Sequence, residues 1–129
     1  PLYSSAASDV YKRQLQVSGL SYTIDTSVPT TVQTDEKGNF IKVGGAYRVT
    51  DIKVGAEALD VNKTYTVASH NYMLKSGGDG MTMFAGANIT RDEVMTDVDI
   101  LSAYINTNLG GNVGADYGDP HGQGRIMVK

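Results

Sequence analysis

The sequence predicts an α+β domain with a mixed, mainly antiparallel sheet and one principal helix near the C-terminus. Three observations support this fold class. Short segments with period-two alternation of apolar and polar residues, the pattern of half-buried strands, fill the first half of the chain. Several connections between these segments are short, which favours antiparallel pairing of neighbours. One run of apolar residues at helical spacing follows in the second half.

The first predicted strand runs from Leu15 to Asp25. Its apolar residues fall at 15 and 17 and then at 20, 22 and 24, so the alternation changes phase at Gly19. A bulge centred on a glycine is the usual way in which a strand absorbs such a slip. The polar segment from Thr26 to Gly38 is typical of an exposed connection. Short strands are expected around Val32 and from Phe40 to Val43.

A second strand is predicted around Tyr47 to Val54, with another change of phase near Thr50-Asp51. The segment from Gly55 to Asp60 is typical of a turn. Alternation then returns from Thr64 to Ser69, with Tyr65 and Val67 on one face. We expect these last two strands to pair antiparallel and these two side chains to lie in the core.

The principal helix is predicted from apolar residues at spacings of three and four, namely Val94, Val98, Leu101, Ile105 and Leu109. Thr90 and Thr96 are both possible N-caps, since each has an acidic residue three positions later. Thr96 is favoured because Asp97 and Asp99 then lie in the first turn. Gly110-Gly111 ends the helix, and Val98, Leu101 and Ile105 are expected in the core. The segment from Arg125 to Val128 suggests a final short strand.

Composition limits the function classes. A chain of 129 residues with a net charge of −3 forms one domain at most, and without a basic run it gives no reason to expect polymeric nucleic acid as a partner. No apolar stretch is long enough to cross a bilayer, and cysteine is absent. The segment Pro1 to Gln14 has no sustained period, so we expect a non-native or disordered tail at 1–14 and a domain at 15–129.

The stretch Ser76-Gly77-Gly78-Asp79-Gly80 joins a predicted strand to a short apolar segment. Its three glycines can take positive φ, so the turn can be tight and can let another molecule approach the main chain closely. Asp79 places a carboxylate in the middle of this turn. The same residues also suit an ordinary hairpin turn, in which Asp79 caps its own loop.

The order of strand, aromatic, short spacer and Gly-Gly-Asp-Gly resembles the C-terminal domain of the 5′-nucleotidase family. Further motifs stand in the family's order, namely Leu15-Gln-Val-Ser-Gly-Leu20, Tyr47-Arg-Val-Thr-Asp-Ile-Lys-Val54, Leu59-Asp60 before Lys63-Thr-Tyr-Thr-Val67, and Gly124-Arg125-Ile126. The resemblance covers Leu15 to Lys129 and implies an incomplete copy of that domain.

The resemblance implies a nucleoside site in this chain. Asp79 matches the family's ribose-binding carboxylate, which accepts hydrogen bonds from both hydroxyls of a cis-diol. Tyr72 matches an aromatic that stacks on the base, with Gly77 and Gly78 in the adjoining turn and Gln16 near the base edge. Four residues separate Tyr72 from Gly-Gly where the family usually has three, so Met73 is an alternative stacking side chain. Tyr72 and Gln16 can equally be ordinary strand residues. The family's second aromatic matches Gln14, so one side of the clamp is missing.

The resemblance further implies that the parent protein is a metallophosphohydrolase acting on nucleotide phosphate esters, with divalent metal ions in an N-terminal domain absent from this chain. This chain would then supply nucleoside recognition, hold no catalytic residue or cofactor of its own, and be inactive alone. Family habit implies an extracytoplasmic setting. His70 and His121 are the only histidines, so a metal site in the chain itself is not expected. The competing interpretation is a stand-alone extracellular binding or structural module without catalysis.

Overall fold

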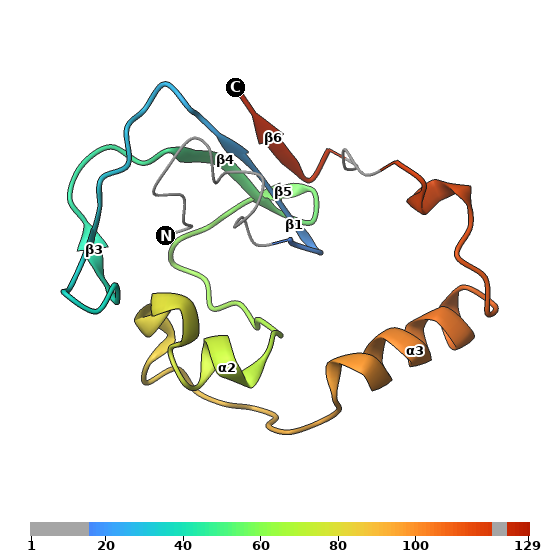
Figure 1. Ribbon diagram of the computed structural model, residues 1–129. Coiled ribbons are helices and arrows are strands. Elements are labelled where there is room, and N and C mark those ends of the chain that lie inside the picture. The colour runs from blue at the N-terminus through green and yellow to red at the C-terminus, as the bar shows by residue number, and fades with distance from the viewer. Residues whose placement is uncertain (1–15, 120–123) are drawn as a thin grey trace. The chain divides into compact units, whose positions relative to one another are not determined.

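The computed structural model describes residues 16–119 and 124–129 (Figure 1). The described residues divide into two compact units. Unit 1 contains those up to Val67 and those after residue 123, and unit 2 contains those from Ala68 to residue 119. Unit 2 is therefore inserted, in chain order, between two parts of unit 1. The segment 1–14, expected to be a tail, lies outside the described residues.

Unit 1 is built on a four-stranded sheet with the strand order β5-β4-β1-β6 (Figure 1). The strands are β1 (Leu20–Ile24), β4 (Val49–Val54), β5 (Glu57–Ala58) and β6 (Ile126–Val128). Strands β1 and β4 pair antiparallel, as do β4 and β5, whereas β1 and β6 pair parallel. The predicted class, α+β with a mixed and mainly antiparallel sheet, is confirmed.

The bulge in this sheet lies on β4 and not, as expected, at Gly19. Between the pairs Ser21↔Lys53 and Thr23↔Thr50, two residues of β4 face the single residue Tyr22 of β1. Asp51 takes the left-handed conformation there, with φ 52. The phase change near Thr50-Asp51 therefore predicted a real bulge. Gly19, with φ 73, instead ends the irregular segment before β1, which is shorter than the predicted strand.

A separate two-stranded antiparallel sheet pairs β2 (Val32–Thr34) with β3 (Phe40–Val43), and both strands lie where the sequence predicts them. Asp35 organises the turn between them, because its carboxylate accepts hydrogen bonds from the backbone N–H groups of Lys37 at 2.9 Å and Asn39 at 2.8 Å, and from Asn39 Nδ2 at 2.8 Å. The hydrogen bonds that Asn39 donates are the largest cause that lowers the pKa of Asp35 below its ordinary value.

The core of unit 1 centres on β1. Tyr22 and Ile24 are 2% and 4% exposed and point to one face of the sheet, and Thr23 between them is buried as well. Partly buried side chains from the neighbouring strands and the segment before β1 pack on this pair, namely Val17, Leu20, Val49, Ile52 and Ile126. β1 is buried because β4 and β6 flank it on both sides.

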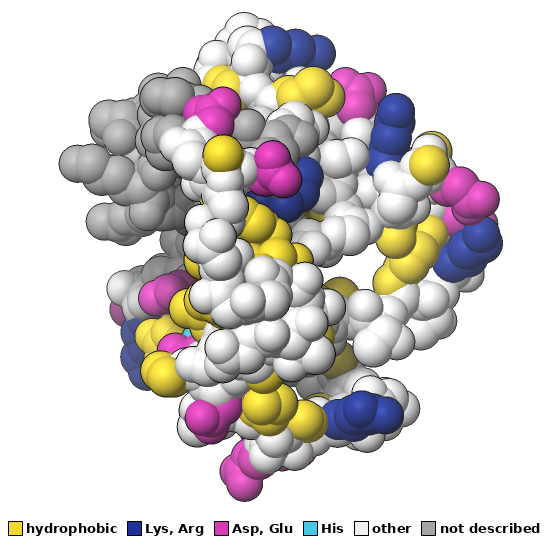
Figure 2. All heavy atoms as spheres, turned by 90° about the vertical axis from the view of Figure 1, so that its right-hand side faces the viewer, with side chains coloured by type: hydrophobic (Ala, Val, Ile, Leu, Met, Phe, Trp, Pro, Cys, Tyr) yellow, Lys and Arg dark blue, Asp and Glu magenta, His cyan; other side chains and the backbone are white. Residues whose placement is uncertain are grey.

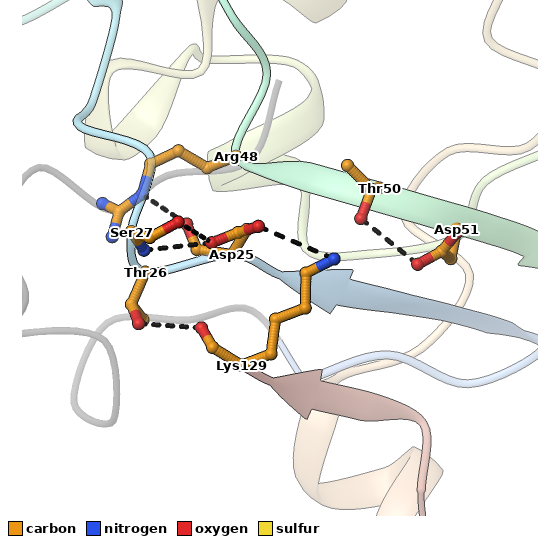
Figure 3. A network of polar contacts seen from close by, with 7 residues as sticks. All are labelled: Asp25, Thr26, Ser27, Arg48, Thr50, Asp51 and Lys129. Carbon is orange, nitrogen blue, oxygen red and sulfur yellow. Dashed lines mark hydrogen bonds and ion pairs between the residues drawn. The ribbon is translucent and has the colours of Figure 1, made fainter.

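Polar contacts hold β6 to the end of β1 (Figure 3). The backbone N–H and Oγ1 of Thr26 both donate to the carbonyl oxygen of Lys129 at 2.8 Å. Asp25 accepts hydrogen bonds from the Oγ of Ser27 at 2.6 Å and from its N–H at 3.0 Å, and lies 3.6 Å from Lys129 Nζ. The hydrogen bonds from Ser27, and then the positive charge of Lys129, lower the pKa of the Asp25 carboxyl.

The strand predicted from Thr64 to Ser69 is wrong. This segment has no regular secondary structure and is exposed, and no strand pairing involves it among the described residues. β5 takes the free edge of β4, and the Tyr65 hydroxyl accepts a hydrogen bond from the backbone N–H of Asp60 at 3.0 Å. Tyr65 and Val67 are 37% and 60% exposed, so their predicted place in the core is also wrong.

Unit 2 contains α2 (Asn71–Leu74), the 3₁₀ turns η2 (Gly78–Gly80), η3 (Thr82–Phe84) and η4 (Ala115–Tyr117), and the helix α3 (Asp97–Asn108). α3 begins where the sequence predicts. Thr96 is its N-cap, and its Oγ1 accepts a hydrogen bond from the backbone N–H of Asp99 at 3.2 Å. Gly110 and Gly111, both at positive φ, follow the helix end.

The apolar stripe of α3 does not form a core in the described part of the chain. Val98 and Leu101 are 68% and 61% exposed, and Ile105 is half-buried. The predicted core positions on this helix are therefore wrong. Of the predicted stripe, only Val98, Leu101 and Ile105 lie in α3, because Val94 precedes the helix and Leu109 is its C-cap. Periodicity also says nothing of what covers a helix face.

Charges of both signs are mixed on the face drawn in Figure 2, and hydrophobic side chains lie at the surface between them. This mixture agrees with the small net charge of −3. Among the described helices, none is long and apolar enough to cross a membrane.

Candidate functional site

The candidate site begins with the single turn of α2. His70 precedes the helix in extended conformation, with φ −62 and ψ 140, and makes no side-chain cap hydrogen bond. At the other end, the carbonyl oxygen of Asn71 accepts hydrogen bonds from the backbone N–H groups of Lys75 at 2.8 Å and Ser76 at 3.1 Å. The chain therefore curls around one carbonyl before it reaches the glycines.

The turn at Gly77 to Gly80 uses the conformational freedom that its sequence predicts. Gly77 and Gly80 have φ 66 and 77, a region in which side chains are disfavoured. Gly78 is buried, and its carbonyl oxygen accepts a hydrogen bond from the N–H of Met81 at 3.1 Å. Met81, 4% exposed, anchors the far end of the turn.

Asp79 lies at the outer side of this turn. Its backbone is left-handed, with φ 53 and ψ 28, a conformation that costs free energy for a non-glycine residue and that aspartate tolerates better than most. The side chain is exposed, and no hydrogen bond or ion pair joins its carboxylate to another described residue. The turn therefore presents a carboxylate whose oxygens are available as acceptors.

Tyr72 packs directly on this turn. A Cβ atom built at Gly78 would lie 2.3–2.5 Å from three atoms of the Tyr72 ring, so the ring occupies the space above the Gly78 backbone. Tyr72 is still 56% exposed. An aromatic ring that is held on one side and open on the other is suited to stacking with a flat ligand.

Comparison with known protein families assigns the chain. The model of the 5′-nucleotidase, C-terminal domain, matches residues 3–86, more than half of the chain. The chain belongs to the 5′-nucleotidase C-terminal domain family. The family resemblance seen in the sequence is confirmed, and the glycine turn lies within the matched range. The match begins inside the segment expected to be a tail at 1–14, and it ends at residue 86, short of the predicted limit at Lys129. The search of curated proteins and the search of solved structures gave no match.

Four of the five residues that the sequence associated with the family's nucleoside site lie close together in the chain. Tyr72, Gly77, Gly78 and Asp79 all lie in unit 2, within one continuous stretch of chain. Gln16 belongs to unit 1, where it is exposed and lies outside the strands. The role of each in the family's binding site stays a prediction.

Among the described residues, no three His, Cys, Asp or Glu side chains are close enough to hold a metal ion. His70 occupies the N-cap position of α2 without a side-chain cap hydrogen bond, and His121 lies outside the described residues. The donor set in the described ranges therefore does not fit a divalent cation, and no chemical step in this chain is assigned to one.

An ion pair that the sequence did not predict lies beside the site. Lys75 Nζ donates to Asp92 Oδ2, which joins the end of α2 to the segment before α3. The hydrogen bond to Asp92 and its negative charge raise the pKa of Lys75, and the hydrogen bond from Lys75 lowers the pKa of Asp92. The partners are 17 positions apart, beyond the helical spacings at which sequence reveals charge pairs.

Proposed function

We propose that this chain is the nucleoside-recognition part of a 5′-nucleotidase-type phosphohydrolase that acts on nucleotide phosphate esters. One observation carries the proposal: the exposed carboxylate of Asp79 follows directly on a turn whose backbone supports the ring of Tyr72. Family membership supports the substrate class, because the chain shares the domain that 5′-nucleotidases carry.

Asp79 is assigned to the ribose. A carboxylate without a protein partner can accept hydrogen bonds from both hydroxyls of a cis-diol, and charge-assisted hydrogen bonds are about twice as strong as neutral ones. The left-handed backbone at Asp79 suits this role, since functional residues are often held in such costly conformations.

Tyr72 is assigned to the base. Stacking on an aromatic ring accepts any base, because each base has a π-face. Gly77 carries no side chain beside the ring, so a ligand can approach the main chain there, and the buried Gly78 supports the ring from its covered face. Gln16 is assigned to the base edge, as an amide that can donate and accept hydrogen bonds.

Hydrolysis is assigned to a further domain of the parent protein. Divalent metal ions held there would stabilise the charge that develops on the phosphate and activate water for attack on phosphorus. The present chain holds and orients the nucleoside, and by itself it has no catalytic activity. By family resemblance, the parent protein is assigned to an extracytoplasmic setting. Chelator-sensitive hydrolysis of nucleoside monophosphates by the purified 129-residue chain would contradict this division of roles.

Titration of the purified chain with adenosine tests the site. We expect the amide and side-chain NMR signals of Tyr72 and Asp79 to shift, and 2′,3′-dideoxyadenosine, which lacks both hydroxyls, to bind at least about tenfold more weakly. Asp79→Asn should weaken adenosine binding and leave dideoxyadenosine binding unchanged.

Asp51→Asn is the matched control for this titration. Asp51 is also exposed and also left-handed, with φ 52, but it lies in the bulge of β4. We expect adenosine to bind this variant as it binds the unaltered chain. If adenosine shifts none of the signals, or if Asp79→Asn binds it equally well, the turn is an ordinary one and a binding or structural module without catalysis is the better account.

A further inference from the structure

The backbone of Gly78 lies so close to the ring of Tyr72 that no side chain would fit at position 78. A Cβ atom there would lie 2.3 Å from Cε1, 2.4 Å from Cζ and 2.5 Å from Cδ1 of Tyr72. Real Cβ atoms essentially never come within 3.0 Å of such a neighbour. The requirement for glycine comes from this lack of room, because Gly78, unlike Gly77 and Gly80, is not at positive φ.

The same distances give the orientation of the ring. Three consecutive ring atoms are nearly equidistant from the built Cβ position, which is possible only if that position lies over the face of the ring and not beyond its edge. One face of Tyr72 is therefore covered by the backbone of Gly78. The exposed 56% of the residue must come mostly from the opposite face and the edges.

Local backbone geometry produces this contact. Four residues separate Tyr72 from Gly77, and the turn of α2 with its two hydrogen bonds to the Asn71 carbonyl takes up three of them, Met73, Leu74 and Lys75. The left-handed Gly77 then reverses the chain so that Gly78 lies against the ring. The same helical turn leaves Met73 less exposed than Tyr72.

We propose that Gly78 is a positioning residue that fixes the ring of Tyr72 flat on the turn, so that the chain offers a base one open ring face, on Tyr72 and not on Met73. This inference rests on the proposed nucleoside-binding function and adds to it which side chain stacks, and from which side. Gly78 acts through Tyr72, because the ring contacts the base and the backbone of Gly78 lies behind the ring.

A double-mutant cycle without ligand tests the positioning. Gly78→Ala should lower the Tm of the chain by about 5 °C or more, because its methyl group collides with the ring, and should lower it by much less in the Tyr72→Ala background. Gly114→Ala is the matched control, since Gly114 has φ −74 and no atom lies within 4 Å of its built Cβ. Equal effects of Gly78→Ala in both backgrounds would overturn the inference.

NMR gives a second readout, which does not depend on the variant being stable. Protons over the face of an aromatic ring resonate upfield, so the Gly78 Hα signals of the unaltered chain should lie upfield of their positions in Tyr72→Ala. If Gly78→Ala alone fails to fold, recovery of folding in the double variant supports the same contact. Gly78 Hα signals at equal positions in the unaltered chain and in Tyr72→Ala would contradict it.

Adenosine titration then tests the stacking. Tyr72→Ala should bind adenosine about fivefold to 100-fold more weakly, Gly78→Ala should lose a comparable factor, and Met73→Ala should bind as the unaltered chain does. A loss confined to Met73→Ala would overturn the assignment. If the cycle shows the Gly78 contact with Tyr72 but the unaltered chain binds no adenosine, the proposed function fails and the ring position stands.

Discussion

The Oγ1 of Thr96 accepts a hydrogen bond from the backbone N–H of Asp99 at 3.2 Å and donates one to the Asp99 carboxylate at 2.6 Å. This reciprocal contact satisfies one of the free N–H groups at the start of α3 and places a negative charge in its first turn. It is the reason that the helix begins at Asp97 and not after Thr90, the other start that the sequence offered.

Loss of this cap should destabilise α3. Thr96→Ala removes the acceptor for the Asp99 N–H, and we expect a loss of about 1 kcal/mol in the free energy of unfolding, with lower helical content by circular dichroism. Thr90→Ala is the comparison, because Thr90 lies outside the helix. Equal losses in the two variants would show that the cap contributes nothing specific.

Truncation of the core tyrosine should cost more than any surface change. Tyr22→Ala removes the most buried side chain of β1, which is 2% exposed, and should lower the free energy of unfolding by about 3 kcal/mol or more. Tyr47→Ala, at a side chain that is 65% exposed, should change it by less than about 1 kcal/mol. Urea unfolding of both variants checks the difference.

Alkaline pH should weaken unit 1 through the same residue. Burial raises the pKa of the Tyr22 hydroxyl above its ordinary value, so the folded chain favours the neutral form. The resulting stability is fully present below the ordinary pKa of about 10 and is lost as the pH rises through the folded value. The Tm measured between pH 8 and 11 should therefore fall more steeply in the unaltered chain than in Tyr22→Phe.

Acid should weaken the attachment of β6. Hydrogen bonds from Ser27 lower the pKa of Asp25, so its contribution to stability is present above the ordinary pKa of about 3.9 and is lost as the pH falls through the folded value. Ser27→Ala should raise the pKa of Asp25 toward that ordinary value. NMR titration of the Asp25 carboxyl carbon in both chains measures this shift, and identical titration curves would contradict the assignment.

The Lys75 to Asp92 ion pair should act over a wide pH window. The pKa of Lys75 is raised and that of Asp92 is lowered, so the stabilisation is present between about pH 4 and pH 10 and is lost on either side. Both side chains are partly exposed, so Asp92→Asn should cost little and less in high salt. Tm values at low and high ionic strength check this, with Glu36→Gln, at an exposed residue of unit 1, as the comparison.

Where local rules decide the structure, the sequence predicted it well. β3 and the start of α3 follow from alternation and from a capping threonine, both of which act within a few residues. The bulge at Asp51 was visible as a change of phase for the same reason. The Gly77 turn could be located from its composition, because only glycine takes such φ values freely.

Where the partner of a segment decides its structure, the prediction from the sequence failed. The alternation around Tyr65 and Val67 is a genuine strand pattern, but a strand needs an edge to pair with, and β5 already takes that edge of β4. The contact between Gly78 and Tyr72 was equally invisible, since it depends on how α2 and Gly77 turn the chain in space.

The pairing of β6 with β1 has a kinetic consequence. Thr26 and Lys129 are 103 positions apart, and all of unit 2 must be made before the two can meet. During synthesis, β1 and β4 can pair first, while the other edge of β1 stays open until β6 has been made. An open edge is a template for pairing with another chain, and closure of so long a loop is slow. Chains that end before Ile126 should therefore aggregate in proportion to their concentration, because they can never close that edge.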